Sequence, residues 1–132
     1  HWKSNQHLSA SFSGLTDLDI LVARGQVDQI ENILSRLKFK RFEALPNSKY
    51  RAIDDFFGLD LVTGKLIHLH LHYQLIVWEK LIKGYWLPWE RYILESCRFV
   101  EEAKIHLINP VLELILLFIR FSLKIRFNLS FE

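Results

Sequence analysis

Residues 68–73 read His-Leu-His-Leu-His-Tyr, a strict alternation of imidazole and apolar side chains. Because successive side chains of a β-strand point to opposite faces, this period of two predicts a strand. One face of that strand carries His68, His70 and His72, and the other face is apolar. Imidazoles in this arrangement can ligate a metal or transfer protons near neutral pH. A polar strand face that only contacts solvent is the alternative interpretation.

The histidine strand closes a predicted β-hairpin. The two strands of the hairpin cover residues 53–61 and 66–76, and the turn at residues 62–65 contains a glycine, as tight turns favour. Strands are also expected at residues 18–23, 39–44 and 104–108, and helices at residues 27–37, 78–83, 88–97 and 109–126. This order predicts an α+β fold with a mixed β-sheet, flanking helices and a C-terminal helical segment.

The length and hydropathy of the chain predict its organisation. Its 132 residues are enough to bury a core, and half of them are hydrophobic. We expect an α/β core at residues 1–76 and a helical tail at residues 77–132. The last predicted helix is apolar on almost all sides, so we expect it to pack against the core and against a further domain of the same chain. Its uninterrupted apolar run is shorter than the roughly 20 residues of a membrane span, so no membrane partner is predicted.

Charge and cysteine content exclude several classes of protein. The formal net charge of +2 gives no electrostatic support for nucleic acid as a partner. The single cysteine, Cys97, excludes an intramolecular disulfide and offers no zinc-finger pattern. The N-terminal residues lack the basic and apolar pattern of a secretory signal. These features predict a cytoplasmic protein.

A pair of carboxylates precedes the first predicted strand and its apolar, β-branched run. Asp17 and Asp19 are two residues apart, so in an extended chain they share a face and can bind one divalent cation. The Ser13-Gly14 step lies just upstream, where a phosphate could approach the backbone. This layout is typical of metal-dependent phosphoryl or nucleotidyl transfer, and an acidic strand end without a ligand is the alternative. The carboxylates and histidines form one site only if their strands are neighbours.

From Gly14 to Val22, and through the helix, strand and hairpin that follow, the chain resembles the nucleotidyltransferase fold of the DNA polymerase β superfamily. It is most similar to nucleotidyltransferases whose core reads Lys-Gly, then Asp-hydrophobic-Asp-Leu-Leu-Val, then a strand ending His-Val-Asp-Leu-His-Trp. The resemblance covers residues 2–120, and residues 87–91 and 109–114 are similar to the helical tail of that group. It implies transfer of a nucleoside monophosphate from a nucleoside triphosphate to an acceptor hydroxyl.

The resemblance also implies a metal site. Asp17 and Asp19 would hold Mg²⁺, which bridges the nucleotide phosphates. His70 takes the position of the third carboxylate, which in the superfamily completes the metal site and activates the acceptor hydroxyl. His68 and His72 match the flanking histidines and are secondary candidates. At the position of His70 the sequence departs from the family pattern.

The implied nucleotide-binding residues lie near the N-terminus. Lys3 and Ser4 match the Lys-Gly step of the family, so Lys3 would contact phosphate. Ser13 and Gly14 are the remaining trace of the glycine-serine signature of the superfamily.

Three functions stay open because a histidine replaces an acid. His70 could act as a base, or ligate an ion with more affinity for nitrogen, such as Mn²⁺ or Zn²⁺. The chain could instead be an inactive relative that only binds nucleotides or a partner. The third function is a plain metal site of the three histidines, with Asp17 or Asp19 as a fourth ligand.

Other polar and aromatic residues receive structural interpretations. Asp54 and Asp55 open the hairpin and are expected to be solvated loop carboxylates. The tryptophans and tyrosines of residues 78–92 are expected to pack in a core or a domain interface.

Overall fold

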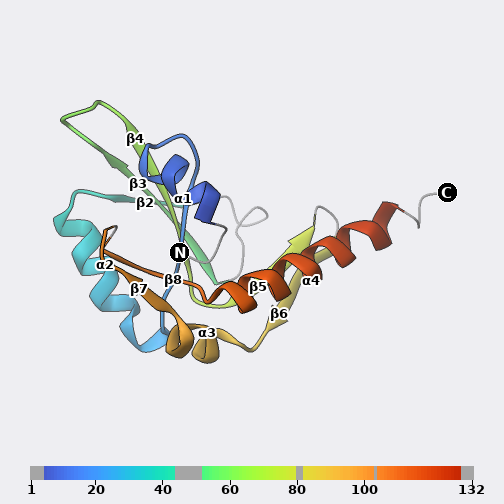
Figure 1. The fold of residues 1–132 in the computed structure, drawn as a ribbon. Coiled ribbons are helices and arrows are strands. Elements are labelled where there is room, and N and C mark those ends of the chain that lie inside the picture. Colours follow the sequence, from blue (N-terminus) through green and yellow to red (C-terminus); the bar gives the residue numbers. More distant parts are fainter. Residues whose placement is uncertain (1–4, 44–51, 80–81, 103, 129–132) are drawn as a thin grey trace. The chain divides into compact units, whose positions relative to one another are not determined.

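A computed structural model describes residues 5–43, 52–79, 82–102 and 104–128 of the chain (Figure 1). The fold belongs to the α+β class, with a mixed four-stranded sheet, flanking helices and a C-terminal helix. The chain divides into two compact units, His1–Tyr73 and Gln74–Glu132, which are described separately. The boundary expected from the sequence follows residue 76, near this division.

The first unit contains the mixed sheet. In the order β1-β4-β3-β2, the strand β1 runs parallel to β4, and the other neighbours are antiparallel. The elements of this unit are α1 (Asn5–Phe12), β1 (Leu18–Leu21), a short 3₁₀ helix (Arg24–Gln26), α2 (Val27–Arg36), β2 (Lys40–Phe42), β3 (Ile53–Leu59) and β4 (Leu66–His72).

The predicted hairpin is formed by β3 and β4, and its turn sets the register of the two strands. The Asp60 amide donates to the Lys65 carbonyl at 2.9 Å, and Gly64 adopts a positive φ of 69° within the turn. The strand pairing that follows places Asp55 directly opposite His70. The second strand ends at His72, four residues earlier than the sequence suggested.

The apolar face of the histidine strand lies in the core of the first unit. Leu69 and Leu71 of β4 are buried together with Phe56 of β3, Leu34 of α2 and Val22 after β1. The burial of Leu69 and Leu71 therefore confirms the predicted apolar face of the strand. The histidines lie on the opposite face of the sheet. The amphipathic helix predicted at residues 27–37 is α2, whose buried side chain joins this core.

The second unit is built from two small antiparallel pairs of strands and two helices. The pairs are β5 with β6 and β7 with β8. Its elements are β5 (Leu75–Glu79), β6 (Ile82–Leu87), α3 (Glu90–Ser96), β7 (Arg98–Val100), β8 (Ile105–Leu107) and α4 (Pro110–Asn128). The Glu90 carboxylate joins the first pair to α3, because it accepts hydrogen bonds from the Leu75 amide at 2.9 Å and the Trp86 indole at 2.6 Å.

The prediction of a helix at residues 78–83 is wrong. Residues 78–79 end β5, and residues 82–83 begin β6. The reason is the alternation that starts upstream, where Leu75 and Val77 are almost fully buried and commit the segment to a strand. The strand β7 was also not predicted.

The C-terminal helix begins as the sequence predicts. The Asn109 side chain accepts a hydrogen bond from the Val111 amide at 2.9 Å, which is the contact of an N-cap residue. Leu112 and Leu116 are buried on one face of α4. Over residues 110–123 of this helix, the side chains described as exposed and apolar are Val111, Leu114, Ile115, Leu117, Phe118 and Phe121.

Among the residues that the structure describes, no helix has the length and apolar character to cross a membrane.

Candidate metal centre

The parallel pairing of β1 with β4 brings the two sequence motifs together. Asp19 lies opposite His70, and Leu21 lies opposite His72. Asp17 directly precedes β1 and shares the face of Asp19. The strands of the carboxylates and of the histidines are therefore neighbours, as a joint site requires.

The outer part of the cluster is formed by Asp17 and two imidazoles. The Oδ1 atom of Asp17 lies 2.8 Å from His68 Nδ1, and its Oδ2 atom lies 3.9 Å from His70 Nε2. The Asp17 side chain is 46% exposed, so solvent reaches this end of the cluster. A phosphate or other anionic group can approach an ion bound here without unfolding the sheet.

The inner part of the cluster is buried around Asp19. The Oδ1 atom of Asp19 lies 3.0 Å from His72 Nε2 and 3.4 Å from His70 Nδ1. The Asp19 side chain is only 2% exposed, and that of His72 only 5%. Burying a carboxylate is costly unless it is paired, and here the two imidazoles supply the partners.

Asp55 is a member of the cluster that the sequence analysis assigned to a solvated loop. It lies within β3, and its Oδ1 atom is 3.2 Å from His68 Nε2 and 3.0 Å from His70 Nε2. The sequence did contain a signal. Counting back from the Asp60–Lys65 turn along an antiparallel hairpin places residue 55 opposite residue 70.

The electrostatics of the cluster favour a bound cation. The Asp19 carboxylate, by its hydrogen bond, raises the pKa of His70 above the ordinary value of a histidine, although burial opposes this change. The charges of Asp19, Asp55 and Asp17 act in the same direction. Three carboxylates thus surround one ring, and the negative potential that retains a proton also attracts a divalent ion.

Two overlapping sets of donor atoms could each hold a metal ion. The sets are Asp17-His68-His70 and Asp19-His70-His72, and within each set the donors lie within 4.8 Å of one another. For comparison, ligands of a tetrahedral zinc ion lie about 3.3 Å apart when each bond is about 2.0 Å. The mixture of imidazole and carboxylate suits Mn²⁺ and Zn²⁺, whereas Mg²⁺ prefers oxygen donors alone.

Neighbouring side chains hold the cluster in place. The buried Ser11 hydroxyl of α1 donates to the Asp17 carbonyl at 2.9 Å and lies 3.0 Å from the Thr16 hydroxyl. The Phe57 ring stacks on the His68 ring with centroids 4.2 Å apart. The first contact fixes the backbone at Asp17, and the second restricts the ring of His68.

The predicted nucleotide-binding residues do not join the cluster in the described part of the chain. Lys3 and Ser4 lie outside the described residues. Ser13 and Gly14 end α1: the Gly14 amide donates to the Ser11 carbonyl at 3.1 Å, and the next amide donates to the Ala10 carbonyl at 2.9 Å. These two bonds and the φ of 71° at Gly14 define a Schellman cap. The Ser13 hydroxyl also donates to the Ala10 carbonyl.

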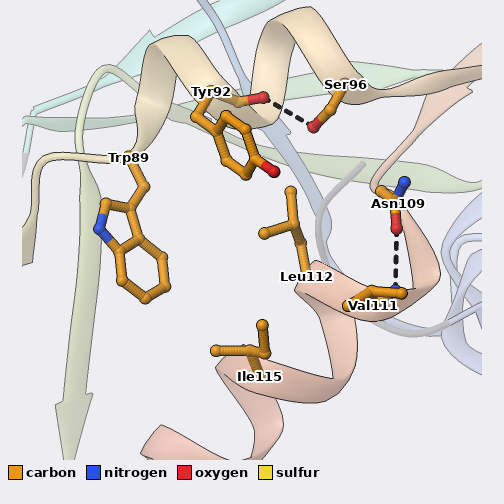
Figure 2. A pocket seen from close by; sticks show the side chains of 7 residues that line it. All are labelled: Trp89, Tyr92, Ser96, Asn109, Val111, Leu112 and Ile115. Carbon is orange, nitrogen blue, oxygen red and sulfur yellow. Dashed lines mark hydrogen bonds between the residues drawn. The ribbon is translucent and has the colours of Figure 1, made fainter.

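The second unit has a pocket between α3 and the start of α4 (Figure 2). Its polar side chains serve local structure, since the Ser96 hydroxyl donates to the Tyr92 carbonyl and Asn109 caps α4. The pocket contains none of the predicted site residues. Its lining consists of Trp89, Tyr92, Ser96, Asn109, Val111, Leu112 and Ile115.

The chain was compared with protein-family models, with curated proteins and with solved structures, and none of the three comparisons gave a match.

Proposed function

We propose that this chain is a divalent-metal-dependent nucleotidyltransferase, which moves a nucleoside monophosphate from a nucleoside triphosphate to an acceptor hydroxyl. The observation that carries the proposal is the parallel pairing of β1 with β4, which aligns Asp19 with His70. Asp17 and Asp19 would hold the ion at a site with one solvent-exposed end. The ion, when bound, neutralises charge on the phosphates.

The proposed reaction is a displacement at the α-phosphorus of the nucleotide. The oxygen of the acceptor hydroxyl bonds to this phosphorus while the bond to the bridging oxygen breaks, and pyrophosphate leaves. The hydroxyl proton passes to a base. His70 is the candidate base if its ring does not ligate the ion, and it can accept the proton at pH values above its raised pKa, where the ring is neutral.

The donor set supports Mn²⁺ as well as the Mg²⁺ that the resemblance implies. Asp17 and Asp19 supply oxygen donors, which both ions accept, whereas the imidazoles of His68 and His70 favour Mn²⁺. Transfer is therefore expected to be faster with Mn²⁺ than with Mg²⁺.

A second candidate function is metal binding without catalysis. It is favoured by His70, which stands where the superfamily has its third carboxylate, and by the buried contact between Asp19 and His72. In this case the cluster would hold Zn²⁺ or Mn²⁺ in a structural or nucleotide-binding module.

Calorimetric titration and a pyrophosphate-release assay separate the two functions. The purified chain is titrated with ATP, GTP and CTP in the presence of Mn²⁺ or Mg²⁺, and product is measured with small-molecule hydroxyl acceptors. We expect nucleotide affinity to fall at least tenfold in Asp17→Asn and to stay unchanged in Asp28→Asn, an exposed aspartate of α2. A protein that binds the ion but releases no pyrophosphate, whether or not it binds a nucleotide, would contradict nucleotidyl transfer and support the second function.

The variant His70→Asp tests the departure from the superfamily. Loss of existing activity in this variant would show that the histidine is functional. Activity that appears only in the variant would identify the natural chain as an inactive relative.

A further inference from the structure

Asp55 lies beside the two imidazoles at the exposed end of the cluster. Its Oδ1 atom is hydrogen-bonded to His68 Nε2 at 3.2 Å and lies 3.0 Å from His70 Nε2. The other nitrogen of each ring faces a different carboxylate. His68 Nδ1 is hydrogen-bonded to Asp17 at 2.8 Å, a shorter contact than that to Asp55, and His70 Nδ1 is hydrogen-bonded to Asp19 at 3.4 Å. His70 Nε2 also lies 3.9 Å from Asp17. Each ring thus extends from Asp55 to one of the paired aspartates.

We infer that Asp55 is a positioning residue, which holds His68 and His70 by their Nε2–H groups when an ion is bound. Nδ1 of His68, beside Asp17, and Nδ1 of His70, beside Asp19, are then the donor atoms. A neutral imidazole carries one N–H, so a proton held at Nε2 makes Nδ1 the free electron pair. Metal-ligating histidines commonly donate their second nitrogen to a carboxylate in this way. The inference rests on the proposed metal site and assigns His70 as a ligand, not a base.

The position of Asp55 suits an orienting role better than a ligand role. Neither of the two donor sets found among the described residues includes Asp55. One oxygen of its carboxylate, Oδ1, contacts a nitrogen of both rings. The backbone of Asp55 is paired on both sides, with Phe42 of β2 and with His70 of β4. A carboxylate in an inner strand of a sheet has little freedom to move, so it fixes the rotation of both rings.

The neighbouring Asp54 is a matched control. It belongs to the same strand, but its side chain points to the opposite face and pairs with Arg41 at 2.8 Å. Replacing either aspartate by alanine removes one carboxylate from β3. Only Asp55→Ala removes a partner of the imidazoles.

The test measures the tautomer of each ring and the affinity for a metal ion. Long-range ¹H–¹⁵N spectra of the Zn²⁺-loaded chain are expected to show Nε2–H for His68 and His70. In Asp55→Ala both rings should become tautomer mixtures, and Zn²⁺ affinity by calorimetry should fall about 10- to 100-fold. Asp55→Asn keeps an acceptor oxygen and should restore the tautomer and most of the affinity, while Asp54→Ala should change neither. Circular dichroism checks that each variant is folded.

An Nδ1–H tautomer in the Zn²⁺-loaded natural chain would overturn the inference, as would a Zn²⁺ affinity that falls equally in Asp55→Ala and Asp54→Ala. These readouts need no nucleotide, so they separate this inference from the proposed function. A tautomer and affinity that depend on Asp55, in a chain that binds no nucleotide, would uphold the inference and reject nucleotidyl transfer. Nucleotidyl transfer activity, together with a metal affinity that is the same with and without the Asp55 carboxylate, would support the proposed function and reject the inference.

Discussion

His70 is the residue on which the chemistry of the cluster depends. One of its nitrogens faces Asp19, and the other faces Asp55 at 3.0 Å and Asp17 at 3.9 Å. A ring in contact with three carboxylates is either a strongly held imidazolium or a metal ligand. Protons and metal ions therefore compete for it.

This competition predicts the pH dependence of metal binding. The carboxylates raise the pKa of His70, with Asp19 as the largest cause, so the ring stays protonated at pH values where an ordinary histidine is neutral. An ion must displace that proton, so metal affinity should rise with pH up to the raised pKa and then level off. Below it, affinity should fall about tenfold per pH unit for one displaced proton.

Calorimetry with Zn²⁺ across a series of pH values checks this expectation, and His70→Gln is the comparison. The variant should bind more weakly and show a shallower slope. An identical slope in the variant would mean that another group releases the proton.

At this scale, part of the cluster could be predicted from the sequence. The alternation of side chains along a strand predicted that Asp17 and Asp19 share one face and that the three histidines share another. This could be predicted because the face on which a side chain lies depends only on its position in the extended chain. Asp55 was missed because its neighbours depend on the hairpin register, which requires counting across the turn.

At the scale of elements, the C-terminal cap of α1 determines the direction in which the chain enters β1, the strand that carries Asp19. The Schellman cap at Gly14 turns the chain from α1 towards β1, and a Cβ atom there would lie 3.3 Å from the Leu66 carbonyl oxygen. Only glycine combines this positive φ with such a close approach to β4.

The variant Gly14→Ala is therefore expected to destabilise the fold by about 1–2 kcal/mol, the cost of a left-handed conformation for a residue with a side chain. Gly25→Ala is the matched control, because a Cβ atom there meets nothing within 4 Å and the φ is not positive. It should be neutral or stabilising by about 0.4–1 kcal/mol. Urea unfolding of both variants measures the difference, and equal stabilities would refute the structural role of Gly14.

A second glycine tests the packing of the sheet. A Cβ atom at Gly58 in β3 would lie only 2.6 Å from the ring of Phe39, which packs against the core of the first unit. Gly58→Ala should therefore force that ring aside and cost about 1–3 kcal/mol, as overpacking does. The double variant Gly58→Ala with Phe39→Leu should recover part of the loss in the same unfolding assay. If the single variant is as stable as the natural chain, Phe39 does not pack as described.

Elements with strong local signals could be predicted from the sequence. The hairpin, α2 and α4 were predicted because a turn glycine and the spacing of apolar residues are signals that act over a few residues. The end of β5 and the start of β6 were not predicted, because residues 78–83 mix apolar and charged side chains. The strand conformation follows from the burial of Leu75 and Val77, which the sequence does not show. The pairing of β1 with β4 is also a long-range contact that no local pattern contains.

At the scale of the whole molecule, the cluster belongs to the first of two units. Its two donor sets share His70, so the chain is expected to hold one ion. In the second unit, Cys97 Sγ lies 3.5 Å from His106 Nδ1, and this pair offers only two donors. A second ion with comparable affinity is therefore not expected there.

The central claim is that the aspartates of β1 and the histidines of β4 form one metal site. Its most direct test is calorimetric titration of the metal-free chain with Zn²⁺ and Mn²⁺, repeated on Asp17→Asn, Asp19→Asn and the control Asp28→Asn. The structure predicts one ion per chain, at least tenfold weaker binding in either site variant, and unchanged binding in the control. Binding that is unaffected in both site variants would contradict the claim, and so would no binding of either ion by the natural chain.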